Sequence, residues 1–226
     1  MPEPTSVLLL SSGIGGIMIR YARAQFIRLK RALDVLFVVL TGIITVPLIG
    51  ILALLTKWTS HGPALYAQER VGLNGKIFKL YKFRSMRIDA EKGTGPVWAT
   101  VKDDPRVTAF GKFLRKSHLD ELPQLWNVLI GDMSIIGPRP ERPFFVDKLT
   151  KELPDYQKRL EIKPGITGLA QVLHKADESM DDVKKKLHYD LVYIRKASWW
   201  TDFYIAFRTG VKMLAGERYF STKSEK

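Results

Sequence analysis

The chain of 226 residues contains no cysteine. Disulfides, a thiol nucleophile and thiolate zinc ligands are therefore excluded, and the composition fits a reducing cytosolic environment. Histidine is also scarce, because only four occur and no two stand at the helical spacing of metal ligands. Neither a P-loop nor a strand-linked G-x-G-x-x-G motif is present. Chemistry built on thiols, zinc or these nucleotide-binding loops is not expected.

Acidic residues are too few to balance the basic ones, and the formal net charge is +13. Such an excess of positive charge requires an acidic partner, which is nucleic acid, anionic lipid or a phosphorylated substrate. The length allows one sizeable domain with appendages.

A long apolar run follows a basic segment. Residues 20–31 hold five Lys and Arg, and residues 35–56 carry no charge. At about 1.5 Å per residue the run can span a hydrocarbon core of ~30 Å, so a simple transmembrane anchor is one interpretation. Pro47, however, bends or breaks a helix, and the basic flank should stay cytosolic. We favour a helix that enters the membrane, breaks at Pro47 and leaves on the same side.

The next segment has the pattern of a β-hairpin. Two aromatic-rich runs, residues 65–71 and 76–86, flank a glycine-rich turn at residues 72–75. Cations crowd the second run, including Lys82 and Arg84. They form either a solvated or lipid-facing strand face or a grip on phosphate groups, since Lys and Arg are the usual phosphate ligands.

Two adjacent carboxylates, Asp120 and Glu121, follow a basic patch that includes Arg115. Apolar residues behind them recur at helical spacing, so a helix begins near the pair. Ser117 and Asp120 fit a capping-box variant, whereas Pro123 favours a start two or three residues later. In either register both carboxylates lie at a helix N-terminus, where anions are favoured.

For an arbitrary Asp-Glu pair, capping alone is the simpler explanation. Here Gly131 ends the helix, and the stiff turn Pro138-Arg139-Pro140 presents a further cation. Adjacent helical side chains point about 100° apart, so the carboxylates cannot share a proton, but one can attack while the other binds a metal. The pattern favours phosphate chemistry.

Two helices are expected near the C-terminus. Residues 182–196 form a charged helix with one apolar side, and Ser198 caps a second helix from Trp199 to Leu214. The second is either a buried core helix or one lying in the headgroup plane. Tryptophan mixed with cations favours the membrane interface.

The segment L-D-E-L-P-Q-L-W-N-V-L-I-G-D-M-S-I-I-G-P-R-P, residues 119–140, resembles the signature of the bacterial sugar transferases, the monotopic phosphoglycosyl transferases. Further blocks of the resemblance are residues 68–72, 82–86, 104–108 and 163–171, so it extends over about residues 30–210. The family often carries a serine before the membrane proline, where this chain has Val46.

The resemblance implies an α+β, mostly helical protein with a re-entrant membrane helix-break-helix, a small cytosolic catalytic domain with a β-hairpin, and interfacial amphipathic helices. We expect a basic leader at residues 1–30, the membrane hairpin at 31–57, the catalytic domain at 58–180 and membrane-interface helices with a tail at 181–226. The implied location is the bacterial inner membrane, with the catalytic domain on the cytoplasmic face.

The implied reaction transfers a sugar-1-phosphate from a nucleoside diphosphate sugar, expected to be UDP-linked, to polyprenyl phosphate. Asp120 would attack the phosphorus and Glu121 would bind Mg²⁺. The expected substrate-binding residues are Arg115 and Arg139, with Lys82 and Arg84 as weaker candidates, and the flanking Pro138 and Pro140.

Membrane lipid is an expected partner and nucleic acid is not. The sugar and the glycan pathway are not encoded in any rule we can read, and the oligomeric state, including a homodimer, is open. Two alternatives remain: a one-step transfer with Asp120 as base, and a non-enzymatic basic peripheral membrane protein that binds nucleic acid or anchors partners.

Overall fold

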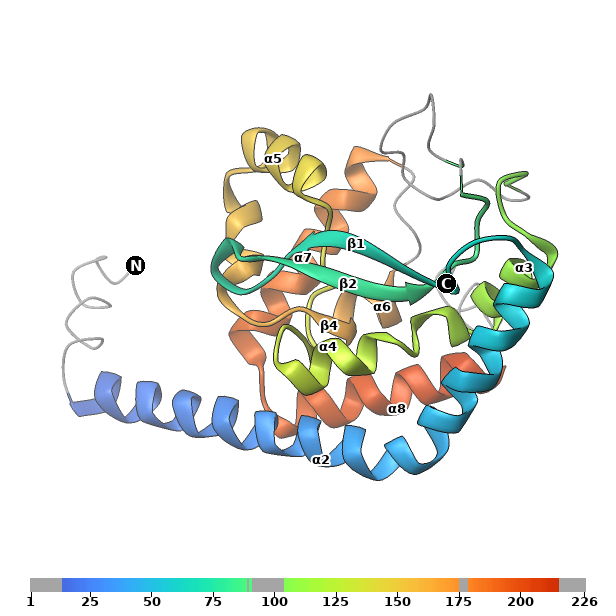
Figure 1. The fold of residues 1–226 in the computed structure, drawn as a ribbon. Coiled ribbons are helices and arrows are strands. Elements are labelled where there is room, and N and C mark those ends of the chain that lie inside the picture. Colours follow the sequence, from blue (N-terminus) through green and yellow to red (C-terminus); the bar gives the residue numbers. More distant parts are fainter. Residues whose placement is uncertain (1–13, 89, 91–103, 175–178, 216–226) are drawn as a thin grey trace.

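The structure, a computed structural model, describes residues 14–88, 90, 104–174 and 179–215 (Figure 1). Parts of the expected leader, of the loop after the hairpin and of the tail therefore lie outside the described residues. The described part is mostly helical with two small sheets, which confirms the coarse α+β prediction. Its α-helices are α2 (Ile14–Thr59), α3 (Ala109–Lys116), α4 (Gln124–Ile130), α5 (Pro143–Glu152), α6 (Leu169–Leu173), α7 (Met180–Lys196) and α8 (Trp199–Ala215).

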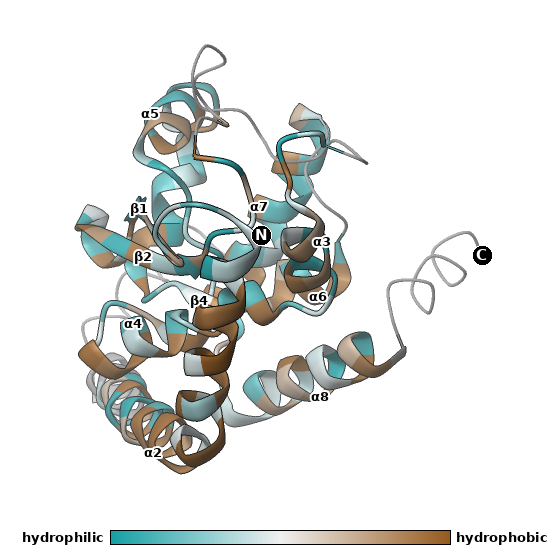
Figure 2. Cartoon of the chain, turned by 45° about the vertical axis from the view of Figure 1, so that its right-hand side comes forward, coloured by the Kyte–Doolittle hydropathy of each residue, from teal (hydrophilic) through white to brown (hydrophobic). Residues whose placement is uncertain are grey.

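Helix α2 contains both the basic segment and the apolar run in one continuous helix. The helix stays continuous through Pro47, and its ribbon changes direction in the second half (Figure 1). Within the described residues it is the one helix long and apolar enough to cross a membrane. Figure 2 shows its hydrophobic stretch, and Ile43 and Ile44 are 78% and 74% exposed.

Helix α2 packs against the same globular domain before and after Pro47. Before Pro47, Val38 is buried with Val128 and Met133, and the Asp34 carboxylate accepts a bond of 3.1 Å from the Ile135 amide. After Pro47, Leu52 is buried with other apolar side chains, namely Phe83 and Leu114. The exposed apolar residues Ile43 and Ile44 therefore lie between two attached positions of the helix.

The hairpin forms as predicted, with β1 (Leu65–Val71) antiparallel to β2 (Ile77–Phe83). The 3₁₀ turn η1 (Leu73–Gly75) connects the strands, and Asn74 there has a left-handed φ of 55°. Asn127 of α4 fixes the hairpin, since its amide donates to the Lys79 carbonyl at 2.7 Å and its oxygen accepts from the Tyr81 amide at 3.1 Å. The hairpin is thereby held against α4.

A second sheet joins β3 (Ser134–Ile136) and β4 (Gly165–Thr167) in parallel. The sequence analysis predicted neither of these strands, so their pairing was missed. A Cβ at Gly165 would lie 2.1 Å from the Gly137 nitrogen, which shows how close the two backbones run. Because Gly137 directly precedes Pro138, this contact fixes the position at which the Pro138-Arg139-Pro140 turn begins.

Helices α5 and α7 and the 3₁₀ segment η3 (Pro154–Glu161) enclose a separate core that includes Phe145, Leu149 and Val183. The first turns of helix α8 contact α2, since Phe26 packs on Trp199 and the Lys30 ammonium forms an ion pair with Asp202. Trp200, Phe203 and Phe207 of α8 are 83%, 66% and 61% exposed. The predicted helix is confirmed, and these aromatic side chains are exposed rather than buried in a core.

Candidate active site

The acidic pair lies in a 3₁₀ turn, η2 (Leu119–Glu121), between α3 and α4. The predicted capping box is wrong, because the Ser117 hydroxyl donates back to the Phe113 carbonyl at 2.8 Å and Ser117 ends α3. His118 then adopts a left-handed φ of 56°, which turns the chain. Pro123 precedes the first residue of α4, so the later of the two predicted starts is the one observed.

Glu121 is bound by two cations. Arg139 Nη2 lies 2.5 Å from Oε1 and Nη1 lies 3.3 Å from Oε2, and Lys82 Nζ lies 3.4 Å from Oε1. Burial alone would raise the pKa of Glu121, but the charges of Arg139 and Lys82 outweigh it and hold the pKa well below its usual range. Glu121 is therefore a permanent anion.

Asp120 differs from Glu121 in its contacts and in the direction of its pKa shift. Among the described residues, no hydrogen bond or ion pair reaches its carboxylate, although Lys82, Arg115 and Arg139 are near enough to act on its charge. Burial and the negative charge of Glu121 raise the pKa of Asp120, and the three cations oppose this rise. An anion with no bonded partner in a cationic setting is a suitable nucleophile.

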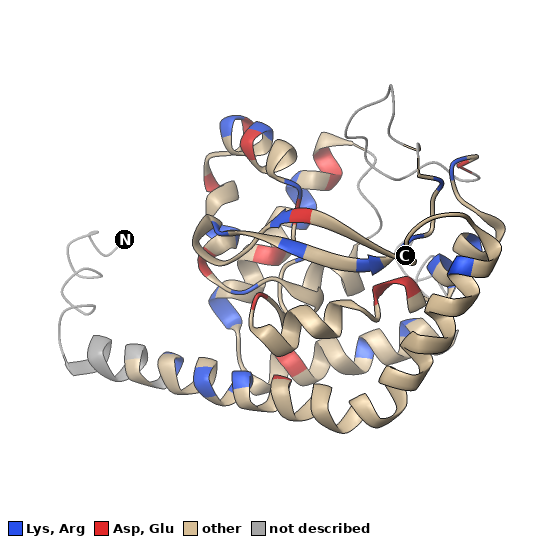
Figure 3. Cartoon of the chain, in the orientation of Figure 1, with Lys and Arg blue, Asp and Glu red and all other residues tan. Residues whose placement is uncertain are grey.

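Both carboxylates line an open cavity of about 1240 Å³. Ten Lys and Arg residues line it against three Asp and Glu, so a dianionic or trianionic ligand is electrostatically favoured there. Figure 3 shows Lys and Arg residues on the hairpin and on several helices of the chain. The cationic lining residues are Arg70, Lys82, Arg84, Arg87, Arg106, Arg115, Arg139, Arg142, Lys186 and Lys212.

The cavity also reaches α2 and α8, the two helices with many exposed apolar side chains. Phe37, Thr41 and Thr45 of α2 and Thr209 and Met213 of α8 line it together with the acidic pair. A phosphate attached to an apolar chain can therefore approach the carboxylates from between the two exposed apolar helices.

The predicted phosphate ligands differ in how free they are. Arg115 donates from Nε to the Ser85 hydroxyl at 2.8 Å and faces the cavity. The terminal nitrogens of Arg84 bind the Ser60 and His61 carbonyls at 2.8 and 2.6 Å. Arg84 thus ties the end of α2 to β2, and its role in binding phosphate stays a prediction.

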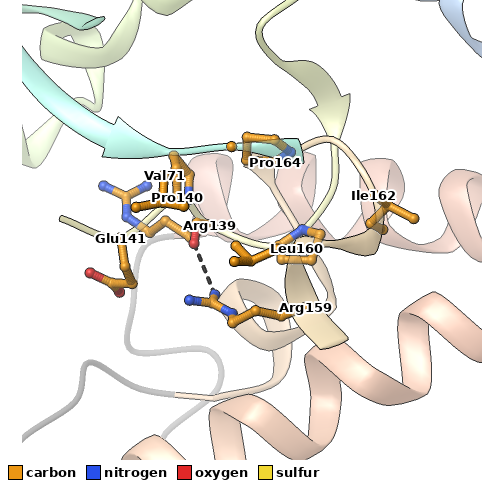
Figure 4. A pocket seen from close by; sticks show the side chains of 10 residues that line it. Val71, Arg139, Pro140, Glu141, Arg159, Leu160, Ile162 and Pro164 are labelled. Atoms are coloured by element: carbon orange, nitrogen blue, oxygen red, sulfur yellow. Dashed lines mark hydrogen bonds between the residues drawn. The ribbon is translucent and has the colours of Figure 1, made fainter. Parts of the chain in front are cut away.

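Pro138 and Pro140 are buried and line a second, small cavity beneath Arg139 (Figure 4). They hold the backbone on either side of Arg139 rather than face the large cavity. Their fixed φ angles leave Arg139 with little backbone freedom.

Sequence reasoning missed a second charged cluster beside Arg139. Glu141 accepts from Lys186 Nζ at 2.6 Å and lies 3.5 Å from Arg70 Nη1, and all three line the cavity. Burial would raise the pKa of Glu141, yet Lys186, Arg159 and Arg70 lower it to about 2. The position of Glu141 directly after Pro140 was the available signal, whereas nothing in the sequence points to Lys186.

The described residues contain no group of three or more His, Asp and Glu side chains able to hold a metal ion by themselves. Mg²⁺ is commonly held by one or two carboxylates together with substrate phosphates. Asp120 and Oε2 of Glu121, which within the described chain accepts only from Arg139, fit that mode. The donor set is therefore suited to a magnesium ion that arrives with a diphosphate.

The chain matches the family model described as bacterial sugar transferase over residues 24–216, and it belongs to this family. The match contains the acidic pair, Arg139, helix α8 and most of helix α2, so the family relationship extends to the whole candidate site.

Three relatives are named for related activities. An Aeromonas hydrophila protein named UDP-N-acetylgalactosamine-undecaprenyl-phosphate N-acetylgalactosaminephosphotransferase is 44% identical over 188 residues, 83% of this chain and 44% of its own length. A Xanthomonas campestris pv. campestris protein named UDP-glucose:undecaprenyl-phosphate glucose-1-phosphate transferase is 46% identical over 170 residues, 74% of this chain and 35% of its own.

A Bacillus subtilis (strain 168) protein with a provisional name, undecaprenyl-phosphate N-acetylgalactosaminyl 1-phosphate transferase, is 53% identical over 137 residues, 61% of this chain and 75% of its own. The chain thus spans less than half of the length of the first two relatives and most of the third.

Proposed function

We propose that the protein transfers a sugar-1-phosphate from a UDP-sugar to polyprenyl phosphate, giving polyprenyl-diphosphate-sugar and UMP. The observation that carries the proposal is the Asp120 carboxylate, which has no bonded partner among the described residues and lies beside a clamped Glu121 in a cavity with ten cations. Family membership and the names of the relatives support the same reaction.

In the first step an oxygen of Asp120 forms a bond to the sugar-bearing phosphorus. The bond from that phosphorus to the bridging oxygen breaks, and UMP leaves with that oxygen. In the second step an oxygen of the lipid phosphate attacks the same phosphorus, the bond to Asp120 breaks, and the carboxylate is restored. Arg115, Arg139 and Lys82 balance the negative charge of the two phosphate substrates. Mg²⁺, when bound with the diphosphate, would neutralise charge further.

The acceptor side of the proposal rests on α2 and α8. The exposed apolar surface on both helices fits a position in one leaflet, and the cavity opens between them. Because Val38 and Leu52 each pack against the catalytic domain, a spanning α2 would have to carry part of that polar domain across the bilayer. We therefore propose the re-entrant arrangement, with the domain on the cytoplasmic face of the inner membrane.

The decisive experiment measures UMP release from UDP-sugar with polyprenyl phosphate in the purified, detergent-solubilised chain. Asp120→Asn should abolish release of UMP, and Asp147→Asn, which changes an exposed carboxylate on α5, should leave it intact. With the lipid omitted, mass spectrometry should find a sugar-phosphate adduct on Asp120. Equal UMP release by wild type and Asp120→Asn would overturn the proposal.

The same experiment separates the alternatives. Turnover without any adduct would favour a one-step transfer with Asp120 as base. No turnover by the wild type with any UDP-sugar would favour a non-enzymatic membrane protein. The relatives are named for N-acetylgalactosamine and glucose, so UDP-N-acetylgalactosamine and UDP-glucose are the first donors to compare.

A further inference from the structure

A buried ion pair lies outside the acidic site. Arg159 of η3 and Asp190 of α7 are each 2% exposed, and two guanidinium nitrogens of Arg159 lie 3.1 and 2.7 Å from Asp190 Oδ2. Arg159 Nη1 also donates to the Tyr156 hydroxyl at 2.7 Å. A buried pair of this kind costs desolvation energy and often contributes little net stability, so stability alone does not account for it.

The pair reaches the active site through one backbone atom. Arg159 Nη2 donates to the main-chain carbonyl of Arg139 at 2.9 Å. Figure 4 shows this bond and shows that the Arg139 side chain extends away from Arg159. Arg139 and Arg159 both line the small cavity there, which measures about 10 Å³. The position of the Arg139 backbone is thereby fixed from the side opposite the acidic pair.

We propose that Arg159, held by Asp190 and Tyr156, is a positioning residue for Arg139. It touches no reacting atom. Its bond to the Arg139 carbonyl sets where the Arg139 guanidinium lies, and that guanidinium in turn holds both oxygens of Glu121. Pro138 and Pro140 limit the backbone angles of the turn, and Arg159 selects the one placement that brings Arg139 to Glu121. The inference rests on the proposed function.

The test compares single and double substitutions. Arg159→Leu alone leaves Asp190 charged and buried without its partner, so both stability and activity should fall. Arg159→Leu combined with Asp190→Leu removes both charges, and its melting temperature should return close to the wild-type value. The Arg139 carbonyl still lacks its donor in the double variant. We therefore expect kcat/KM for UMP release to remain at least about tenfold below the wild type, whereas a purely structural pair would recover activity together with stability.

A second measurement does not depend on turnover. Hydrogen exchange of the peptide that contains residues 137–141 should be faster in the double variant, with exchange unchanged in α3, which carries neither substitution. Lys158→Leu is the matched control, because Lys158 neighbours Arg159 on η3 but pairs with Asp155 in solvent at 60% exposure. It should change neither activity nor exchange.

Three results would overturn the inference: full activity in the stable double variant, unchanged exchange at residues 137–141, or a double variant as unstable as Arg159→Leu. A wild type that releases no UMP would instead refute the proposed function. The exchange measurement would still decide whether Arg159 fixes the Arg139 segment.

Discussion

Arg139 binds both carboxylate oxygens of Glu121, at 2.5 and 3.3 Å, and leaves the adjacent Asp120 without a bonded partner in the described part of the chain. The two neighbouring carboxylates thereby differ in their bonded partners and in the direction of their pKa shifts. The charges of Arg139 and Lys82 override burial and lower the pKa of Glu121, whereas burial raises the pKa of Asp120. One carboxylate is fixed as an anchor for cations, and the other is free to attack.

Replacing Arg139 by lysine should cost much of the activity. Lysine keeps the positive charge but cannot bind two carboxylate oxygens in the planar arrangement of a guanidinium. A hydrogen bond to a charged group contributes about 1.5–3 kcal/mol, so kcat/KM for UMP release should fall by roughly 10- to 150-fold. Steady-state kinetics with a UDP-sugar measures this, and an Arg139→Lys variant with wild-type kinetics would show that the bidentate contact is dispensable.

Glu141 should make stability depend on pH in the acidic range. The pKa of Glu141 is about 2 in the folded chain, below the ordinary 4.5. A lowered folded-state pKa contributes stability above pH 4.5, and this contribution is lost as the pH falls toward 2. The difference corresponds to about 3 kcal/mol at about 1.36 kcal/mol per unit.

The measurement compares melting temperatures of the wild type and Glu141→Gln at about pH 7, 5, 4 and 3, a range that brackets the ordinary carboxylate pKa. The wild type should have a clearly higher melting temperature than Glu141→Gln at neutral pH, and the difference between the two melting temperatures should narrow below pH 4.5. Glu152→Gln, an exposed carboxylate at the end of α5, serves as control. A gap that widened on acidification would mean that Glu141 is destabilising as an anion.

Gly111 should not tolerate a side chain. A Cβ there would lie 2.0 Å from the Ser85 carbonyl oxygen. Helix α3 would therefore have to move away from the backbone of Ser85, which follows β2. Gly111→Ala should therefore destabilise the fold by about 1–3 kcal/mol and break the Arg115–Ser85 hydrogen bond.

Gly210→Ala is the matched substitution on α8, because nothing lies within 4 Å of the added atom. It should stabilise the helix by up to about 1 kcal/mol through helix propensity. Thermal unfolding of both variants gives the comparison, and equal effects would mean that the contact at Gly111 relaxes without cost.

Pro47 should control the path of α2 in the membrane. The chain has no cysteine, so Ala24→Cys and Lys158→Cys each introduce a single thiol for labelling with an impermeant maleimide. In inverted membrane vesicles both should react from the same face. Removing the proline restores about 3 kcal/mol of helix stability, so adding Pro47→Leu to the Ala24→Cys variant should move a fraction of its thiols to the opposite face. Opposite faces in the chain that keeps Pro47 would establish a spanning helix.

Helix α8 should lie against lipid. Phe207→Cys, labelled with a polarity-sensitive dye, should show blue-shifted emission when the protein is placed in liposomes, because this side chain is 61% exposed in the structure. The exposed His188 on α7, substituted and labelled in the same way, should show no shift. Identical spectra at the two positions would remove α8 from the interface.

Much of the fold was predictable because its signals are local. The hairpin was predicted from two aromatic-rich runs around Gly72 and Gly75. Gly131 predicted the end of α4, and in the structure it has the left-handed φ of 96° that favours glycine. The pairing of β3 with β4 was not predictable, since three-residue strands show no periodicity and their partners lie about thirty residues apart.

The residues of the candidate site were likewise predictable only where their sequence signal is local. Asp120, Glu121 and Arg139 could be predicted as site residues because they stand together in one segment, and in the structure Lys82 and Arg115 line the same cavity. Arg159 and Asp190 were not found. Each is a charged residue in a helical segment with the usual sequence appearance of a solvated one, and only the packing of η3 on α7 buries them.

The ion pair between Lys30 and Asp202 joins the first described helix to the last across 172 residues. At a synthesis rate of about 5–20 residues per second, Asp202 is synthesised roughly 9–34 s after Lys30. During that interval Lys30 lacks Asp202, whereas the core partners of Val38 and Leu52 lie between residues 78 and 166 and are synthesised before α8. The core contacts of α2 can therefore form before the ion pair does, and a chain truncated before α8 would keep the partners of Val38 and Leu52 but leave Lys30 without Asp202.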